Sequence, residues 1–518
     1  MSRPKAILGG LFAGLLAAIG MLLMMLVLAS LGVATPLAIL GDRLSVFFTP
    51  GPFLALMGRV GGYNHLKQLG VGSTAAGILA VGTIGGVVLA LFNRRERTRL
   101  STVMTVILFI LLPIVAVAIT LWPVLGTHYR GLPINAARLV TLIGFALCTL
   151  VYERILVGTW RWLVKPKRAA TDAEFSPSVG RRAVVLGGLG LILVGGGAAL
   201  VRKLYRAASF SYDGTQYKGP DVQPITPNDQ FYCVTKNVID PRVDPALWHL
   251  EVDGLVRTPR AYRLEEVKAF SPTEQETTLM CISNGLDGGL MSNARWKGVS
   301  MRDLIAQSSA LSSATKVRLH GVDNYTDTFP VEKALDPTTL VVYEMNGEPL
   351  PHRHGFPARV IVPGYYGEKH VKWLTRIELT GPEAKGFYEK QGWGPDFMVP
   401  TRSRIDVPFD QAVISLGQFV GPVEVKGVAY GGDRGISRVE VSFDDGQQWS
   451  DAEIYYSGGD LGWSLWRARG GWKPQAPGNY VMIARATDGE GEVQEFDPDR
   501  PFSSGATGFH KITVYITA

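Results

Sequence analysis

The sequence predicts a chain of three parts: an α-helical membrane bundle of five spans, an α+β domain and an all-β sandwich. Hydrophobic residues make up 47% of the 518 residues and concentrate before about residue 205. Toward the C-terminus, short alternating strands separated by turn residues replace the long apolar runs. We expect a membrane region over residues 1–205, a linker over 206–226, the α+β domain over 227–400 and the sandwich over 401–518.

Five segments of the first part are apolar over the ~20 residues that a helix needs to cross a bilayer. The first is too long for a signal peptide, and further spans follow it. Glycines in the second and fifth spans would allow close contact between helices. The predicted spans are Ile7–Val33, Val71–Phe92, Val103–Val124, Ile134–Leu156 and Ala183–Val201, and the glycines are Gly72, Gly77, Gly82, Gly86, Gly187 and Gly195.

Positive charges gather in alternate connections, which predicts that one face of the membrane is cytoplasmic. They precede the first span and fill the second-to-third and fourth-to-fifth connections, whereas the connection over Thr35–Gly70 is poorer in them. An odd number of spans then places the C-terminal half outside a bacterial-type cytoplasmic membrane. Arg202, Lys203 and Arg206 favour the opposite orientation. The positive residues are Arg3, Lys5, Arg94, Arg95, Arg97, Arg99, Arg161, Lys165, Lys167, Arg168, Arg181 and Arg182.

The pair Arg181 and Arg182 stands directly before a Gly-rich, moderately apolar span. This arrangement resembles a twin-arginine export signal. An ordinary positively charged flank of a membrane anchor explains the pair equally well, so both interpretations stay open.

The membrane half shows no pattern for carrying electrons or protons. A haem between helices needs axial ligands such as histidine, and the only histidines before residue 205 are His65 and His128, both predicted in loops. The chain has no CxxCH motif, and no ionisable residue is expected in the middle of a span. We therefore expect no haem and a role in anchoring.

Several elements of the soluble half can be located by pattern. The segment WHLEVDGLV (248–256) alternates as a strand does, and ARVIVPG (358–364) indicates a buried strand. Residues 300–307 predict a helix with Ser300 as its N-cap. Asn346-Gly347 predicts a turn between two strands, and Asp445-Gly446 and Asp488-Gly489 are hairpin signals in the last part.

Cys281 follows an apolar strand-like run and enters a loop rich in Gly, Asn and Ser (TLMCISNGLDGGLMSNARWKGV, 278–299). A single cysteine among apolar residues is mostly a packing residue. Two further blocks follow it, YEMNGEPLPHRHGFPARVIVPG (343–364) and YGEKHVKWLTRIEL (366–379). In this order the three blocks resemble the molybdopterin-binding domain of the sulfite oxidase family. The sandwich resembles the immunoglobulin-like dimerisation domain that follows it in that family.

The resemblance implies a sulfite-oxidase-type α+β domain that binds a molybdenum–molybdopterin cofactor, with Cys281 as the thiolate ligand of the metal. It implies oxygen-atom transfer or a related two-electron step. Arg359 and Lys372 are embedded in apolar sequence, which favours a buried anionic partner over surface charges. The implied cofactor-binding residues are Asn237, Cys281, Asp323, His354, Arg359, His370, Val371 and Lys372.

The sequence departs from the family at the positions that collect an anionic substrate. Lys236 replaces an expected arginine and Val238 an expected histidine, Leu286 aligns with a second arginine, and Trp393 aligns with a tyrosine. Lysine keeps one charge but lacks the bidentate fork of arginine. We therefore assign catalytic positions to Lys236 and Trp393 and expect a less charged substrate than sulfite, such as a sulfoxide.

Three other functions stay open: sulfite oxidation after all, a cofactor-free membrane-tethered binding module, and a zinc enzyme. Zinc would use His352 and His354, on one face of a strand, with Glu368 or His370. The expected partners are a small-molecule substrate, membrane lipid, an electron-transfer partner that the sequence does not name, and a second copy of the chain. Although the net charge is +7, no basic run interleaved with aromatic residues indicates nucleic acid.

Overall fold

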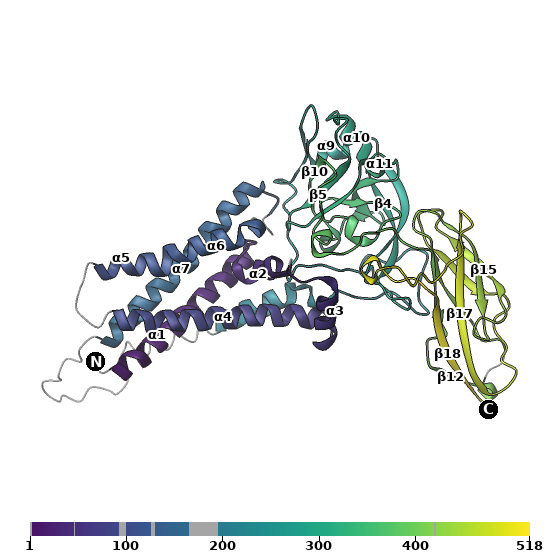
Figure 1. Cartoon of the computed structure of the whole chain (residues 1–518), viewed down its shortest axis with the longest axis horizontal. Coiled ribbons are helices and arrows are strands. Elements are labelled where there is room, and N and C mark those ends of the chain that lie inside the picture. Colours follow the sequence, from purple (N-terminus) through teal and green to yellow (C-terminus); the bar gives the residue numbers. More distant parts are fainter. Residues whose placement is uncertain (1–2, 46, 93–99, 126–129, 165–194, 419–420) are drawn as a thin grey trace. The chain divides into compact units, whose positions relative to one another are not determined.

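The computed structural model describes residues 3–45, 47–92, 100–125, 130–164, 195–418 and 421–518 (Figure 1). The chain divides into two compact units, each described by itself below. Apart from the undescribed residues within them, the first comprises Met1–Ser45, Ala55–Ser211 and Lys236–Arg242, and the second comprises Val46–Leu54, Tyr212–Thr235 and Val243–Ala518.

The first unit is built on four helices that are long and apolar enough to cross a membrane, and they match the first four predicted spans. The helix α1 packs against both α4 and α7 (Figure 1). The predicted fifth span lies largely outside the described residues, as do His128 and the basic residues of 93–99 and 165–182. The elements are α1 (Arg3–Ser30), α2 (Pro36–Ser45), α3 (Pro50–Arg59), α4 (Tyr63–Phe92), α5 (Leu100–Val106), η1 (Ile107–Leu111), α6 (Leu112–Leu121), η2 (Trp122–Val124) and α7 (Ile134–Val164).

Two expectations for this unit are wrong. The segment expected as a loop over Thr35–Gly70 contains α2, α3 and the first turns of α4, so His65 lies on a helix. Its ring Nδ1 is 2.9 Å from the carbonyl oxygen of Gly61. Glu153 lies near the end of the predicted span Ile134–Leu156, but α7 continues to Val164, so the buried Glu153 is in the interior of the helix. The first unit thus carries an ionisable group where none was expected.

The glycines of α4 divide into two kinds. A Cβ atom at Gly86 would collide with the carbonyl oxygen of Gly10, and one at Gly82 would lie 2.6 Å from the Cβ of Ala18. These glycines let α1 and α4 approach closely, as expected. At Gly72, Gly77 and Gly195 an added Cβ meets no described atom within 4 Å, so the same expectation is wrong there, and Gly187 lies outside the described residues.

We expect Gly86→Leu to destabilise the helical unit by about 2 kcal/mol or more, because backbone atoms of α1 cannot yield to the new side chain. Gly77→Leu on the same helix is the matched control, and it should be neutral or slightly stabilising because leucine favours helix. Thermal unfolding in detergent measures both. Equal losses for the two variants would contradict the close contact at Gly86.

The second unit begins with the predicted α+β domain, which holds two sheets. One sheet has the order β2-β1-β10-β5-β6, and the other has the order β3-β4-β7-β8 with β9 beside β7. The elements are β1 (His249–Gly254), β2 (Arg260–Arg263), α9 (Leu264–Lys268), β3 (Thr273–Met280), β4 (Met291–Ser300), α10 (Met301–Ala306), β5 (Lys316–Gly321), β6 (Thr326–Pro330), α11 (Val331–Ala334), β7 (Leu340–Met345), β8 (Glu348–Pro349), η4 (His352–His354), β9 (Arg359–Ile361), η5 (Gly367–Lys369), β10 (Leu374–Thr380) and η6 (Glu389–Gln391).

Local signals place several of these elements correctly. The helix α10 begins directly after Ser300, although the Ser300 hydroxyl makes no capping hydrogen bond. Asn346 and Gly347 have φ values of 54° and 81°, the left-handed conformation that a tight turn between β7 and β8 requires. The strands β1 and β9 lie within the two segments predicted from alternation and apolar character.

The C-terminal part of this unit is rich in strands and forms one eight-stranded sheet path, β11-β13-β16-β15-β14-β17-β18-β12. Asp445 and Gly446 turn β14 into β15, as predicted. The hairpin predicted at Asp488-Gly489 is not formed. The strand β17 ends at Asp488, and the residues that follow pair with it in one isolated bridge, between Thr487 and Val493. The strands are β11 (Arg402–Val407), β12 (Ala412–Ser415), β13 (Lys426–Tyr430), β14 (Ile436–Ser442), β15 (Ser450–Ser457), β16 (Ser464–Ala468), β17 (Gly478–Asp488) and β18 (His510–Thr517).

The predicted linker over 206–226 has little regular structure, yet it is packed. The ring of Tyr217 stacks on Trp463 with centroids 6.2 Å apart. The backbone amide of Thr226, a fully buried residue, donates to the carbonyl of Asn293 at 2.9 Å. The later part of this segment therefore belongs to the body of the second unit.

Candidate functional site

Cys281 is the first residue after β3, and its loop fixes the direction of the thiol. Its amide donates to the carbonyl of Leu290 at 3.0 Å, and the amide of Asn284 donates back to the carbonyl of Cys281 at 3.0 Å. The Sγ atom is 3.1 Å from the Ser283 hydroxyl oxygen. Burial raises the pKa of the Cys281 thiol to about 11, so the residue is a thiol at neutral pH until a bound cation stabilises the thiolate.

Arg359 is a buried cation at the start of β9, with 4% of its surface exposed. Its Nη1 and Nη2 atoms donate to the carbonyls of His354 and His370 at 3.1 and 3.2 Å. Its Nε is buried and has no hydrogen-bond partner among the described residues. Burial lowers the pKa of Arg359 to about 10, which leaves the guanidinium charged at neutral pH.

Two further cations lie beside Arg359, and their charges act on the same histidine, His354. Lys372 donates to the carbonyls of Arg353 and Val234 at 3.1 and 3.3 Å. Arg353 donates to the carbonyl of Asn228 at 3.2 Å. Within the described part of the chain, none of the three cations forms a hydrogen bond or ion pair with a carboxylate. Such an excess of partly buried positive charge fits an anionic ligand with phosphate-type oxygens.

Both site histidines are neutral. The Nε2 atom of His354 is 3.2 Å from the carbonyl of Asn228. In His370, Nδ1 accepts from the amide of Val362 at 3.2 Å, so Nε2 carries the proton and donates to the carbonyl of Tyr365 at 3.1 Å. Burial lowers the pKa of His370 to about 3, and the charge of Arg359 adds to this effect.

The zinc alternative finds no support in the described residues, which contain no group of three or more His, Cys, Asp or Glu side chains able to hold a metal ion. The expected strand face is also wrong, because His352–His354 forms the short 3-10 helix η4. The side chain of His354 is buried while His352 is exposed, so the two rings do not share one environment.

Asp323 and Val371 complete the predicted positions of the second unit. The Oδ1 atom of Asp323 accepts from the amide of Tyr325 at 3.2 Å. Val371 is buried, and its carbonyl accepts from the amide of Val360 at 2.9 Å. A Cβ at Gly321 would lie 2.7 Å from the Asp323 carboxylate and 2.8 Å from the Lys372 carbonyl, so β5 brings these predicted residues together.

Lys236 and Asn237 belong to the first unit, where helices hold them. The Lys236 ammonium is 2.6 Å from the carboxylate of Asp42 on α2, and their side chains are 8% and 11% exposed. The carbonyl of Asn237 accepts from Lys67 on α4 at 2.9 Å and from Ser209 at 2.8 Å. The sequence offered one signal for these partners, namely single charged residues in otherwise apolar helices.

The sequence did not single out Tyr388, a tyrosine within electrostatic reach of Cys281. Trp393 packs edge-on against Tyr388, with ring centroids 6.0 Å apart. Burial raises the pKa of Tyr388, and the charge of Cys281 is the next cause. Tyr388 is therefore a phenol within electrostatic reach of the Cys281 thiol, as is Tyr232.

Arg402 on β11 is a second missed residue. It is buried, lies 3.2 Å from the sulfur of Met280, and donates to the carbonyls of Asn284 and Gly285 at 3.5 and 2.5 Å. Burial lowers its pKa to about 10, which keeps it charged at neutral pH. The sequence did not predict Arg402 as a site residue, because this residue lies in the C-terminal segment that was predicted to be a separate domain.

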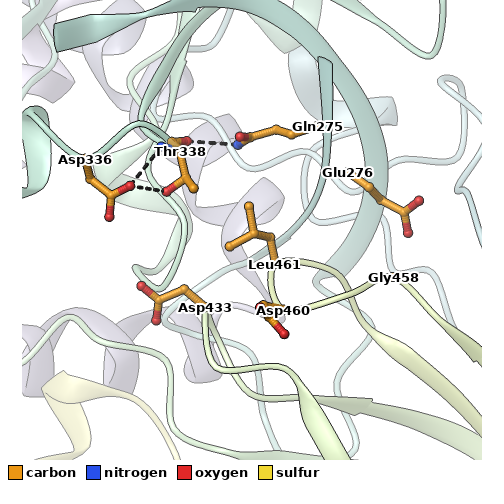
Figure 2. A pocket seen from close by; sticks show the side chains of 8 residues that line it. All are labelled: Gln275, Glu276, Asp336, Thr338, Asp433, Gly458, Asp460 and Leu461. Atoms are coloured by element: carbon orange, nitrogen blue, oxygen red, sulfur yellow. Dashed lines mark hydrogen bonds between the residues drawn. The ribbon is translucent and has the colours of Figure 1, made fainter. Parts of the chain in front are cut away.

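The second unit also has a pocket of about 450 Å³ that contains none of the predicted site residues. Figure 2 shows Thr338 bonded to both Asp336 and Gln275 on one side of this pocket. Its other lining residues are Glu276, Asp433, Gly458, Asp460 and Leu461.

Comparisons with known proteins identify two domain families in this chain. A family described as "Oxidoreductase molybdopterin binding domain" matches residues 237–388, and one described as "Mo-co oxidoreductase dimerisation domain" matches residues 396–515. The sulfite oxidase of Gallus gallus is 32% identical over 320 residues, which cover 52% of this chain and 68% of that protein. The mitochondrial sulfite oxidase of Mus musculus is 32% identical over 323 residues, covering 52% of this chain and 57% of that protein.

A solved structure shares the fold. The sulfane dehydrogenase SoxCD of Paracoccus pantotrophus aligns with a TM-score of 0.50 and 22% identity, over 56% of this chain and 81% of that one. The fold and the two matching family descriptions place the second unit in the class of molybdopterin-binding oxidoreductases. The chain belongs to the sulfite oxidase family. It spans somewhat more than half the length of the mouse and Drosophila melanogaster sulfite oxidases that it matches.

We expect Arg359→Met to weaken cofactor binding about 10- to 100-fold, because it removes a buried cation that has no carboxylate partner. The cofactor-free protein should be as stable as the parent or more stable by about 1–3 kcal/mol, since an unpaired buried charge is lost. Molybdenum and pterin content, together with thermal unfolding of both forms, measure these effects.

Arg376→Met is the control for Arg359→Met, because Arg376 on β10 already pairs with Asp253 at 2.7 Å. This control should keep its cofactor. Full cofactor content in the Arg359 variant would show that the guanidinium is not part of the anion site.

Proposed function

We propose that the chain is a membrane-anchored molybdenum-cofactor oxidoreductase that catalyses oxygen-atom transfer on a small oxo-compound. The observation that carries this proposal is the combination, within one unit, of Cys281 at a strand end and the cations Arg359, Lys372 and Arg353 without carboxylate partners. A soft thiolate suits a molybdenum–pterin centre, and buried cations suit its phosphate.

The role proposed for each residue follows from its contacts. Cys281 would bind the metal, and Arg359 and Lys372 would bind the pterin phosphate. The neutral histidines would act as hydrogen-bonding groups that add no charge, and their ring nitrogens are fixed by backbone partners. Bound there, the cofactor supplies two-electron chemistry. Asn237, Asp323, His354, His370 and Val371 complete the proposed cofactor-binding set.

The proposal extends to the membrane. We infer five spans, the last over Ala183–Val201, with the C-terminal half outside the cytoplasmic membrane and with Arg181-Arg182 as an export signal or a charged flank. The C-terminal part would form an immunoglobulin-like sandwich that pairs two chains. No haem is proposed, so a separate electron-transfer partner is required. The proposed parts keep the ranges 1–205, 206–226, 227–400 and 401–518.

The substrate would carry less charge than sulfite. The positive charge of Lys236 is already paired with Asp42 at 2.6 Å, so it offers little field to a dianion. The position of the second expected arginine holds the apolar Leu286. A sulfoxide is the substrate class that fits these two features.

Sulfite oxidation is the second candidate, and Arg402 favours it. This buried cation lies against the loop that follows Cys281 and donates to carbonyls there. It would supply a positive charge that Lys236 and Leu286 do not. The related sulfite oxidases add weight to this alternative.

The cofactor proposal is tested with Cys281→Ser. Loss of a metal ligand should cost more than the roughly 10- to 100-fold that loss of an outer partner costs. X-ray absorption of the purified protein should lose the protein-derived sulfur at molybdenum. Cys148→Ala is the control, since Cys148 is fully buried in α7, and it should leave the metal environment unchanged. Normal turnover by Cys281→Ser would overturn the proposal.

The substrate proposal is tested with Asp42→Asn. This substitution neutralises the carboxylate beside Lys236, so the net positive charge there rises. The KM for sulfite should then fall about tenfold, which corresponds to ~1.4 kcal/mol, while the KM for a neutral sulfoxide stays unchanged. The double variant Asp42→Asn/Lys236→Gln is the control, and its KM for sulfite should not fall. Rapid sulfite oxidation by the unaltered enzyme at micromolar substrate, abolished in Arg402→Gln, would establish the second candidate instead.

A further inference from the structure

A cluster of carboxyl groups is buried around one lysine in the second unit. The Lys369 ammonium is 2.7 Å from the carboxylate of Asp327 and 2.6 Å from that of Glu389. It also lies 3.8 Å from the centre of the Phe397 ring. Glu368 precedes Lys369 in the chain and feels the charges of all three groups. Three carboxyl groups therefore share a single ammonium group.

The hydrogen-bond donors of the cluster serve two of the three carboxyl groups. Asp327 accepts from the Tyr325 hydroxyl at 2.7 Å and from the amide of Thr328 at 2.8 Å. Glu389 accepts from the Thr328 hydroxyl at 2.8 Å and from the amide of Gly386 at 3.2 Å. Both side-chain oxygens of Glu368 are buried and have no hydrogen-bond partner among the described residues.

A carboxylate in this position would be a buried anion that accepts no hydrogen bond from another described residue, and the nearby ammonium of Lys369 is already bound by Asp327 and Glu389. Such a group keeps its proton instead, because neutralisation removes the cost of burying the charge. Burial is the main cause that raises the pKa of Glu368, to about 8, and the charge of Asp327 is the next. The geometry and the charge balance both point to a neutral carboxylic acid.

Glu368 lies within electrostatic reach of the candidate site. Its charge raises the pKa of the Cys281 thiol, after burial as the main cause. It also raises the pKa of the phenols of Tyr232 and Tyr388, and the charge of Cys281 raises the pKa of both phenols as well. The cluster is also in contact with solvent, because the side chain of Glu389 is 16% exposed. A Cβ added at Gly367 would lie 2.6 Å from the Tyr232 hydroxyl and 3.3 Å from the carbonyl oxygen of Met280, so the residue before Glu368 packs against the residue before Cys281.

We propose that Glu368 is a proton-relay residue, neutral at pH 7, that passes protons between the Asp327–Lys369–Glu389 cluster and the site at Cys281. This inference rests on the proposed oxygen-atom transfer. Reduction of an oxo-compound follows RO + 2H⁺ + 2e⁻ → R + H₂O, with the electrons from a one-electron carrier such as a reduced viologen dye. Glu368 gives one of the two protons toward the site and regains it from solvent through the cluster.

Several charged and titratable groups of the described residues interact electrostatically with Glu368, and they belong to the relay or lie at its edge. The groups that act on Glu368, or on which its charge acts, are Tyr232, Cys281, Tyr325, Asp327, Tyr366, Lys369, Tyr388 and Glu389.

The protonation state is tested without turnover, by comparing the full-length holoprotein with Glu368→Gln. The folded chain keeps this proton up to about pH 8, whereas an ordinary glutamate releases it near pH 4.5. Because the folded state binds the extra proton between these values, its stability should fall as pH rises through this window. Glu368→Gln should remove this fall in stability. The thermal midpoint of the variant minus that of the parent should therefore be larger at pH 9 than at pH 5.

Infrared difference spectra give a second readout of the same state. A carbonyl band of a protonated carboxylic acid should disappear as pH is raised, and it should be absent in Glu368→Gln. Glu332→Gln is the matched control, because Glu332 is exposed on α11, and it should keep the band. Absence of the band in the parent at pH 7, or a constant stability difference across this pH range, would overturn the neutral acid.

The relay itself is tested by kinetics with the dye as donor. Glu368→Gln should lower kcat about 10- to 100-fold with little change in KM and should flatten the pH profile, whereas Glu368→Asp should restore it in part. An unchanged kcat and pH profile would overturn the relay. If instead the parent protein binds no molybdenum, the proposed function fails while the infrared band and the stability difference still decide the state of Glu368.

Discussion

The burial of Arg359 without a counter-charge is the constraint on which the candidate site depends. Its two Nη atoms are used to tie the carbonyls of His354 and His370 together, and its Nε is left over. A protein interior tolerates a bare guanidinium only at a considerable cost. The anionic ligand proposed above would offset this cost. The buried charge is therefore the reason to propose a binding site among residues that otherwise look like a structural core.

The same principle acts with the opposite sign at Glu368. Around Arg359 the described residues provide too few negative charges, and around Lys369 they provide too many. The first imbalance favours an anionic ligand, and the second is relieved by a retained proton. Cys281, Arg359 and Glu368 all act on the pKa of Tyr232. Both regions of unbalanced charge are therefore within electrostatic reach of this one phenol. Ligand binding and proton supply would then depend on one shared electrostatic environment.

The sequence predicted what local pattern and short motifs determine. The Asn346-Gly347 turn, the helix after Ser300 and the strand at 359–361 follow from neighbours in the chain, and Cys281 stood out because of the blocks that follow it. Contacts between distant residues were not predictable in this way. Asp42 meets Lys236 across 194 positions, and Arg402 meets Asn284 across 118. The sequence suggested Glu368 only as a possible zinc ligand, because its burial without hydrogen-bond donors arises from tertiary packing.

The first unit is more than a tether for the rest of the chain. Lys236–Arg242 belongs to it, although the residues on both sides in sequence belong to the second unit. Asp42 and Lys67, polar side chains on helices of mainly apolar composition, hold this segment through Lys236 and through the carbonyl of Asn237. A chain that lacks residues 1–205 would lose both Asp42 and Lys67. The helices and the segment that carries Lys236 and Asn237 are therefore one structural element.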